Sequence, residues 1–452
     1  MSKGKYMTAP VASKKMPAGV PYILTNEASE RFSFYGMSSI LVIFMTDYLM
    51  GRAGALDVMS EKKSEFYFHL FNAAVYFTPF LGALISDIWL GKYRTIIFFS
   101  IVYCFGFLAL TFDHTRLGLG VGLVLIAIGS GIIKPCVSAN VGDQFGQNNK
   151  HLIEKVYSWF YFSINFGAAI SMFLCPWLLD RYGPRMGFGV PAMFMVLATF
   201  AFWLGRWKFV HIPVGGFGSV KQTLDREAIK SLARLCIIYL FVAMFWALFY
   251  QSQSTWVLQA KKMNLNWLGI TWLPAQLQFI NPSLILILIP AFTYCFYPVI
   301  NRIFTLTSLR KISIGMFVTS LSFVVCGWIE TWITAGVKPS IGWQFLAYVI
   351  LTAAEVMVSI TCLEFSYTQA PKKIKSFIMA AYLLSVSLGN AFTSVVNKII
   401  ENKDGTSKLP GASYYWFFTV AMVVTAILFI PVAQRYRVKN YIQDEAPSES
   451  SD

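Results

Sequence analysis

The stretch at residues 82–94 reads Gly-Ala-Leu-Ile-Ser-Asp-Ile-Trp-Leu-Gly-Lys-Tyr-Arg. It joins two apolar runs, residues 66–86 and 93–112, each close to the roughly 20 residues that a helix needs to cross a bilayer. The whole chain repeats this pattern, because it is 56% hydrophobic and only 13% charged, whereas soluble domains carry about 25% charged residues. The sequence therefore predicts a membrane protein with many spans.

Twelve apolar runs are long enough to be spanning helices. They lie at residues 28–50, 66–86, 93–112, 117–139, 155–178, 188–207, 230–251, 274–300, 311–334, 342–367, 376–398 and 413–434. The longest polar connection divides them six and six, so we expect an all-α membrane protein built of two six-helix bundles. The predicted parts are an N-terminal bundle (1–207), a cytoplasmic linker (208–229), a C-terminal bundle (230–434) and a polar cytoplasmic tail (435–452), which we expect to be disordered.

The distribution of basic residues predicts the orientation. With the N-terminus in the cytoplasm, the cytoplasmic segments carry 22 of the 37 lysines and arginines, the outer loops carry 12, and three lie within helices. We therefore expect a multi-pass protein of the cell (plasma or inner) membrane, with both termini cytoplasmic and no cleavable signal peptide. The formal charge of +15 does not indicate a nucleic-acid partner, because the basic residues lie between apolar runs.

The seven cysteines all fall within apolar runs, without the spacing of a metal site or a disulfide. We read them as small core residues and expect no metal ion. No plausible pair of nucleophile and base favours an enzyme, so peptide hydrolysis has no support from the sequence.

The polar stretch also indicates a superfamily. Gly82 allows a close helix contact, Gly91 allows a tight turn, and Asp87 can accept a hydrogen bond from Arg94. With the division into six and six helices, the stretch resembles the cytoplasmic loop motif of the major facilitator superfamily, Gly-x4-Asp-x3-Gly followed by cations. The alternative is an ordinary cytoplasmic turn with two basic residues.

Three charges stand at the head of the first apolar run. Glu27, Glu30 and Arg31 are spaced i, i+3 and i+4, so they share one helix face. Charge within a membrane helix costs roughly 2.5–3.5 kcal/mol per residue on insertion scales. An acid–acid–base cluster can hold or release a proton, depending on whether Arg31 also binds a carboxylate ligand. The alternative is a helix end anchored by an ion pair at the membrane interface.

Further polar residues interrupt later apolar runs. Lys134, next to a helix-bending proline, needs an acid partner or an anionic ligand; Glu355, with Ser359 on the same face, needs a cation or a proton. Asn165 and Asn281 can bind a peptide-like group, although an interhelical hydrogen bond is the simpler explanation for each of them alone. Arg31 and Lys134 in the first half, with Glu355 in the second, predict a polarised cavity that suits a zwitterion such as a short peptide.

His69 stands near the outer end of the second helix. Its unperturbed pKa is close to neutrality, so it is a candidate for proton relay. The alternative is an interfacial histidine that is hydrogen-bonded to backbone.

Together these segments resemble the proton-coupled oligopeptide transporter family. The resemblance rests on Glu-x-x-Glu-Arg-Phe at 27–32, on residues 129–145 with Lys-Pro-Cys-Val-Ser and Gly-Asp-Gln-Phe, on Phe160 to Gly167, on Phe245 to Phe249 and on Glu355 to Pro371. It implies that Glu27, Glu30 and Arg31 couple protons to substrate, with His69 involved as in the animal branch. It also implies that Arg31, Tyr35 and Lys134 face the peptide carboxylate, and that Asn165, Asn281 and Glu355 hold the amino end and backbone.

Departures from the family pattern concern the pocket and the outer gate. Phe34 stands where the family has a first tyrosine, Tyr382 replaces a usual tryptophan near the pocket, and Ser38 and Tyr250 replace the two halves of an outer ion pair. We expect the outer gate to close by other contacts, with Ser38 and Tyr250 as candidates.

The sequence thus predicts a monomeric symporter that imports di- and tripeptides with protons by alternating access and needs no cofactor. Two alternatives remain open at this point. One is a transporter of the same fold for nitrate, an amino acid or another small solute; the other is a receptor-like relative that no longer transports.

Overall fold

The computed structural model describes residues 6–51, 53–214, 226–369, 375–402 and 406–436. It is helical apart from one two-stranded hairpin, and it confirms the predicted class of fold. The tail expected to be disordered lies outside the described residues from position 437 onward.

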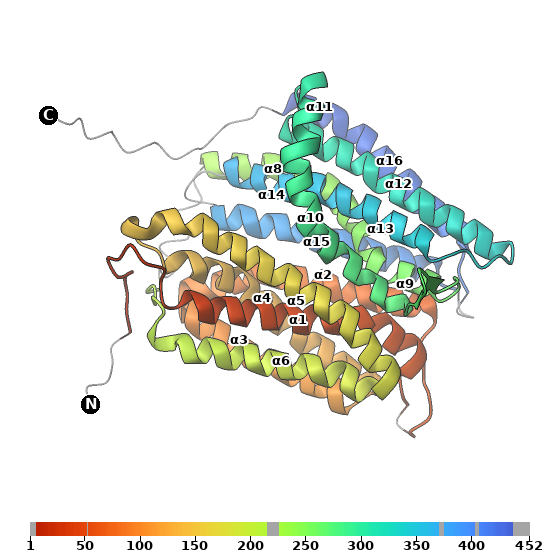
Figure 1. The fold of residues 1–452 in the computed structure, drawn as a ribbon, viewed down its shortest axis with the longest axis horizontal. Coiled ribbons are helices and arrows are strands. Elements are labelled where there is room, and N and C mark those ends of the chain that lie inside the picture. Colours follow the sequence, from red (N-terminus) through yellow and green to blue (C-terminus); the bar gives the residue numbers. More distant parts are fainter. Residues whose placement is uncertain (1–5, 52, 215–225, 370–374, 403–405, 437–452) are drawn as a thin grey trace.

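The first half forms one bundle (Figure 1). Its helices are α1 (Val20–Ile43), α2 (Glu61–Ile85), α3 (Lys92–Phe112), α4 (Arg116–Asp143), α5 (Ile153–Tyr182) and α6 (Pro184–Leu204), with the short elements η1 (Phe44–Tyr48), η2 (Ser86–Leu90), η3 (Gln147–Leu152) and η4 (Gly205–Trp207). Helix α1 packs along α5 and α6, and α4 packs between α2 and α3.

The second half forms the other bundle, in which several spans are built of consecutive pieces. The pieces are α8 (Arg226–Phe249), η5 (Tyr250–Gln253), α9 (Thr255–Ala260), η6 (Pro274–Phe279), α10 (Ile280–Ala291), η7 (Phe292–Phe296), α11 (Tyr297–Ile303), α12 (Ser308–Thr334), α13 (Gly342–Glu355), η8 (Val356–Ile360), α14 (Thr361–Thr368), α15 (Lys375–Ile400) and α16 (Ala412–Arg435). The hairpin of β1 (Asn266–Trp267) and β2 (Ile270–Thr271) follows α9. Helix α8 begins within the segment predicted as linker.

Among the described residues, eleven helical spans are long and apolar enough to cross a membrane. Helix α1, with 24 residues, is the twelfth span. Its mean hydropathy is lowered by buried charged and polar residues, which include Glu27, Glu30 and Arg31. The span with the lowest hydropathy is therefore the one that carries the charged cluster predicted from the sequence.

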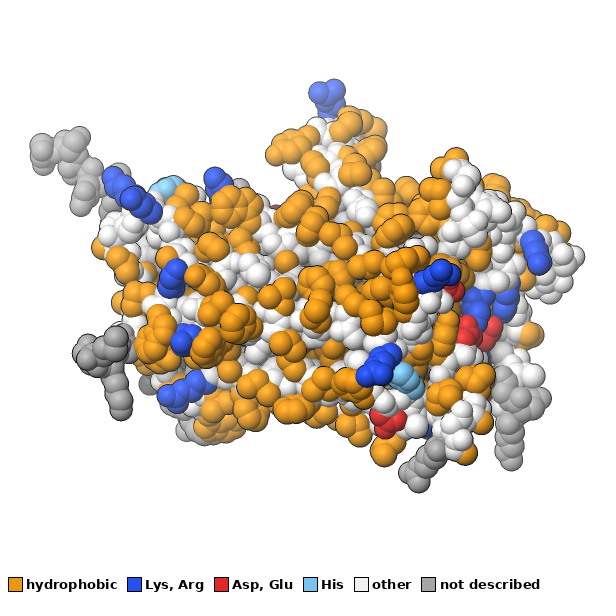
Figure 2. Space-filling model, turned by 60° about the horizontal axis from the view of Figure 1, so that its bottom comes forward, with side chains coloured by type: hydrophobic (Ala, Val, Ile, Leu, Met, Phe, Trp, Pro, Cys, Tyr) orange, Lys and Arg blue, Asp and Glu red, His pale blue; other side chains and the backbone are white. Residues whose placement is uncertain are grey.

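The surface matches a membrane setting (Figure 2). On the face shown there, hydrophobic side chains cover the middle of the molecule, and charged side chains gather toward its two ends. In Figure 1, α9 and the hairpin lie together at the right-hand end of the molecule. We call this end the distal face.

The two bundles meet mainly toward the distal face. Helix α2 runs along α15, and α5 contacts η6 and α10. The hydrogen bonds between described residues of the two bundles follow the same seam, from Ser60 with Glu401 at the rim to Ser387 with Ala73 deeper inside. The structure is thus closed between the bundles on its distal side.

Candidate functional site

The charged cluster of α1 is compact and buried. The Arg31 Nε donates to Glu27 Oε1 at 2.7 Å and lies 3.1 Å from Glu30 Oε2. The hydroxyl of Ser130 on α4 approaches Glu30 Oε1 at 3.4 Å. One guanidinium therefore serves two carboxylates, and a third anion near Arg31 would compete with them for it.

Lys134 on α4 lies beside two aromatic rings instead of an acid. Its ammonium is 4.2 Å from the centroid of the Phe34 ring and 4.4 Å from that of Tyr76. Its Nζ is buried and has no hydrogen-bond partner among the described residues. Cation–π contacts offset only part of the cost of burying a charge, so this ammonium is well placed to bind an anionic group.

Glu355 ends α13, where the chain passes into the widened turn of η8. The Asn281 amide, from α10, donates to Glu355 Oε2 at 2.7 Å and to the Thr352 hydroxyl at 3.1 Å. No cation of the described chain forms an ion pair with Glu355. Asn281 and Glu355, each predicted as a site residue, thus form a single unit that offers a carboxylate.

Tyrosines connect the two charged regions. Tyr35 lies within electrostatic range of Arg31, Tyr76 and Glu355. Tyr161 on α5 lies within the same range of Glu355. Tyr35, on the helix that carries Arg31, is therefore near enough to Glu355 to interact with its charge.

Asn165, Ser359 and Tyr382 make other contacts. The Asn165 amide donates to the Tyr161 carbonyl of its own helix at 3.0 Å. The Ser359 hydroxyl lies 3.1 Å from that of Tyr382, so these two predicted site residues contact each other, and Ser359 forms no hydrogen bond with Glu355. Their roles toward a substrate stay predictions.

His69 is fully buried at the seam between the bundles. Its Nδ1 is 2.9 Å from Asn390 Oδ1, and its Nε2 is 3.0 Å from the Ser254 hydroxyl. Both partners belong to the second bundle. The alternative of an interfacial histidine bonded to backbone is therefore wrong, whereas proton relay stays a prediction.

In the loop between α2 and α3, the expected roles of the two glycines are confirmed, but the expected contact between Asp87 and Arg94 is wrong. A Cβ on Gly82 would lie 2.5 Å from the Ile132 carbonyl oxygen, so only glycine permits this approach of α2 to α4, and Gly91 has a positive φ of 75°. Asp87 forms no ion pair with Arg94.

The charged residues of this loop have other partners. The exposed Asp87 carboxylate accepts from Ser86 beside it at 3.2 Å. The cation used in this loop is Lys92, whose Nζ binds Asp143 Oδ2 of α4 at 2.6 Å.

The distal closure replaces the missing ion pair with several contacts. The Ser38 hydroxyl donates to Gln253 Oε1 at 3.2 Å, and the Tyr250 ring meets Tyr76 at a centroid distance of 5.7 Å. Both residues expected to close the gate thus lie at the seam.

Two ion pairs at the rim were missed from the sequence. Lys261 binds Asp47 at 2.6 Å, and Lys262 binds Glu61 at 3.2 Å. Each pair joins charges about 200 positions apart, which no local pattern relates. Tyr76 was also missed, although it stands seven residues after His69 and hence on the same helix face.

These features match the fold of the major facilitator superfamily, with two helical bundles and charged side chains buried in each. The model of the POT family matches residues 93–224 and 210–417, and the chain belongs to this family.

Curated relatives include solute carrier family 15 member 2 of Rattus norvegicus, 34% identical over 77% of this chain and 53% of that protein. Peptide transporter family 1 of Drosophila melanogaster is 35% identical over 70% of this chain and 48% of that protein. The chain thus spans about half the length of the curated relatives it matches.

Solved structures agree over nearly the full length. An auto-inhibited POT family peptide transporter superposes with a TM-score of 0.87 at 32% identity, covering 95% of this chain and 99% of that one. The POT family transporter PepTSo superposes with a TM-score of 0.83 at 34% identity, covering 93% and 98%.

Proposed function

We propose that the protein imports di- and tripeptides together with protons across the cell membrane, by alternating access. The observation that carries the proposal is the unpaired ammonium of Lys134 near the Arg31 cluster, with the unpaired carboxylate of Glu355 on the other bundle. A short peptide has an anionic and a cationic end, and this site offers each of them a partner. Relatives named as peptide transporters support the choice of substrate.

Coupling follows from competition for one guanidinium. While no peptide is bound, Arg31 neutralises Glu27 and Glu30. A peptide carboxylate that binds Arg31 and Lys134 withdraws part of this charge, so one of the two acids takes up a proton. The membrane potential then adds about 2.3 kcal/mol per charge per 100 mV. Protons are the coupling ion, and no cofactor is involved.

The orientation and setting belong to the same proposal. The distribution of lysine and arginine supports an orientation with both termini in the cytoplasm and the protein in the plasma or inner membrane. The distal face is then the outer face, and the closed seam there corresponds to a state that opens to the inside. We propose a monomer that binds no nucleic acid and catalyses no chemical reaction.

Dialanine uptake into proteoliposomes tests the proposal. We expect an inward proton gradient to drive accumulation, and Glu355→Gln to reduce it strongly because the peptide ammonium loses its charged partner. Glu364→Gln, an exposed carboxylate on α14, serves as the matched control and keeps wild-type uptake. Folded wild-type protein that accumulates no dialanine would contradict the proposal and favour a different solute.

A further inference from the structure

A polar cavity lies at the distal seam, and neither Arg31 nor Glu355 lines it. Its volume is about 270 Å³. Side chains of α2 from the first bundle and of α9, α12 and α16 from the second bundle line it, together with residues 406–411. The peptide pathway proposed above assigns no role to this cavity.

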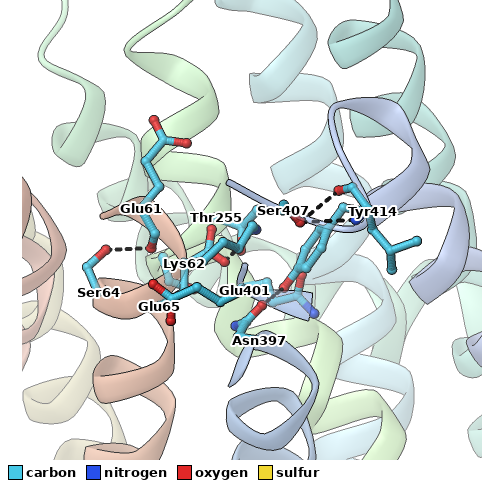
Figure 3. Close-up of polar contacts among 12 residues, drawn as sticks. Glu61, Lys62, Ser64, Glu65, Thr255, Asn397, Glu401, Ser407 and Tyr414 are labelled. Carbon is cyan, nitrogen blue, oxygen red and sulfur yellow. Dashed lines mark hydrogen bonds and ion pairs between the residues drawn. The ribbon is translucent and has the colours of Figure 1, made fainter. Parts of the chain in front are cut away.

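The chain itself shows what the cavity wall can bind. The Lys62 ammonium lies 2.7 Å from Glu65 Oε2 and 3.7 Å above the centroid of the Tyr414 ring. The Tyr414 hydroxyl donates to Asn397 Oδ1 at 2.9 Å, which fixes the ring (Figure 3). A carboxylate beside an aromatic face is the usual setting for an ammonium group.

Glu330 is a further carboxylate of the cavity, and it has no lysine partner of the kind that Glu65 has. It lies on α12, lines the cavity and is only 7% exposed. Its Oε2 accepts from the Gln259 amide at 2.8 Å, but no lysine, arginine or histidine of the described chain lies within ion-pair distance of it. A buried carboxylate without a counter-charge is costly, and a cation in the cavity would offset this cost.

The side chains of the cavity wall favour an organic cation over a metal ion. Among the described residues, no three histidine, cysteine or acidic side chains are placed to hold a metal. The wall instead combines carboxylates with aromatic rings. The Lys62 ammonium covers a face of Tyr414, and the ring of Tyr415 also lines the cavity. A small amine fits both kinds of group, because its ammonium group can bind Glu330 while its methylene groups lie against the ring of Tyr415.

We propose that this cavity is a binding site for a small organic ammonium ion, held by Glu330 and the ring of Tyr415. Because both bundles line the site, a bound amine stabilises the closed distal seam. It therefore slows transport without competing for the peptide site. Binding itself does not depend on the proposed peptide transport.

The test uses the purified full chain with 1,4-diaminobutane as the probe and 1,4-butanediol as its neutral counterpart. We expect the diamine to raise the unfolding temperature in a saturable way, and the diol to leave it unchanged at equal ionic strength. Glu330→Gln keeps the partner of Gln259 but loses the charge, so the half-saturating concentration should rise about tenfold or more. Glu364→Gln should bind like the wild type.

Three results would overturn the proposal. The first is an equal effect of diamine and diol, and the second is unchanged binding in Glu330→Gln. The third is a loss of binding in Glu355→Gln but not in Glu330→Gln, which would place the amine in the central site. If Glu330→Gln does not fold, Ser407→Trp at the cavity rim replaces it: filling the cavity should abolish the shift, and a persisting shift refutes the site.

Uptake kinetics provide a separate readout. Diamine added on the distal side should lower the maximal rate of dialanine uptake and leave its KM unchanged. A competitive pattern would contradict the proposed stabilisation of the seam. Failure of dialanine transport as such would refute the proposed function and leave the binding result intact.

Discussion

His69 offers a sharp test of how the distal seam is closed. The side chain is fully buried on α2, and its two ring nitrogens contact Asn390 and Ser254 of the other bundle at 2.9 and 3.0 Å. His69→Ala removes both contacts and leaves two buried polar groups with fewer partners. The cost falls on the closed state alone, because the open seam lets water reach these groups.

The magnitude follows from typical hydrogen-bond energies. Each of the two hydrogen bonds contributes about 1 kcal/mol net, and a buried partner left unsatisfied raises the loss above this value. We therefore expect the closed state to lose about 2–3 kcal/mol, which changes the ratio of open to closed molecules roughly 30- to 150-fold.

Spin labels across the distal face measure this ratio. Leu56 and Leu268 are 66% and 76% exposed and belong to different bundles, so cysteines placed there can be labelled. The exposed Cys236 and Cys295 are first replaced by serine. Pulsed electron spin resonance should show one short distance in the parent and a second, longer one in His69→Ala.

His114→Ala is the matched control. This histidine contacts the Thr111 carbonyl at the end of α3 at 3.1 Å and does not join the bundles. Its replacement should leave the distances unchanged. Identical distance distributions for His69→Ala and the parent would refute the assignment of His69 as a closing contact.

Three further predictions concern other contacts. Lys134→Met should abolish peptide binding yet raise the unfolding temperature by a few degrees, because it removes a buried charge without an acid partner; a lowered temperature in a thermal-shift assay would refute this. Gly82→Val should cost about 2 kcal/mol or more, since its Cβ would meet the backbone of Ile132 at 2.5 Å, and unfolding in denaturant measures it. Asp47→Lys should open the seam by no more than about 1 kcal/mol, because its pair with Lys261 is partly exposed, and adding Lys261→Asp should restore the parent spin-label distances.

The helices and the charged residues were predictable from the sequence because both depend on local patterns. Apolar runs of about 20 residues predict spans whatever their neighbours are. The spacing of Glu27, Glu30 and Arg31 requires them to share a helix face, and the ion pairs follow from that. The resemblance of the motifs then gave the family, which the comparisons confirm.

Partners from distant segments were not predictable. The aromatic surroundings of Lys134 come from Phe34 and Tyr76, which lie on two other helices. The expected pair of Asp87 and Arg94 was a local guess, and the fold pairs Lys92 with Asp143 of α4 instead.

The rim pairs and the amine cavity likewise depend on how the two bundles meet. Lys261 and Asp47 are 214 positions apart, and Glu330 and Lys62 lie on different bundles. A single sequence contains no signal for such contacts, since each depends on the packing of whole helices.

The central claim is that protons and peptide are coupled through competition for Arg31. Its most direct test compares two modes of transport in Glu30→Gln. The substitution removes the charge that competes for Arg31 and leaves the site of Lys134 and Glu355 in place. We predict that dialanine exchange across the membrane persists in this variant, whereas accumulation driven by a proton gradient is lost. Proton-driven accumulation at the wild-type level would contradict the account.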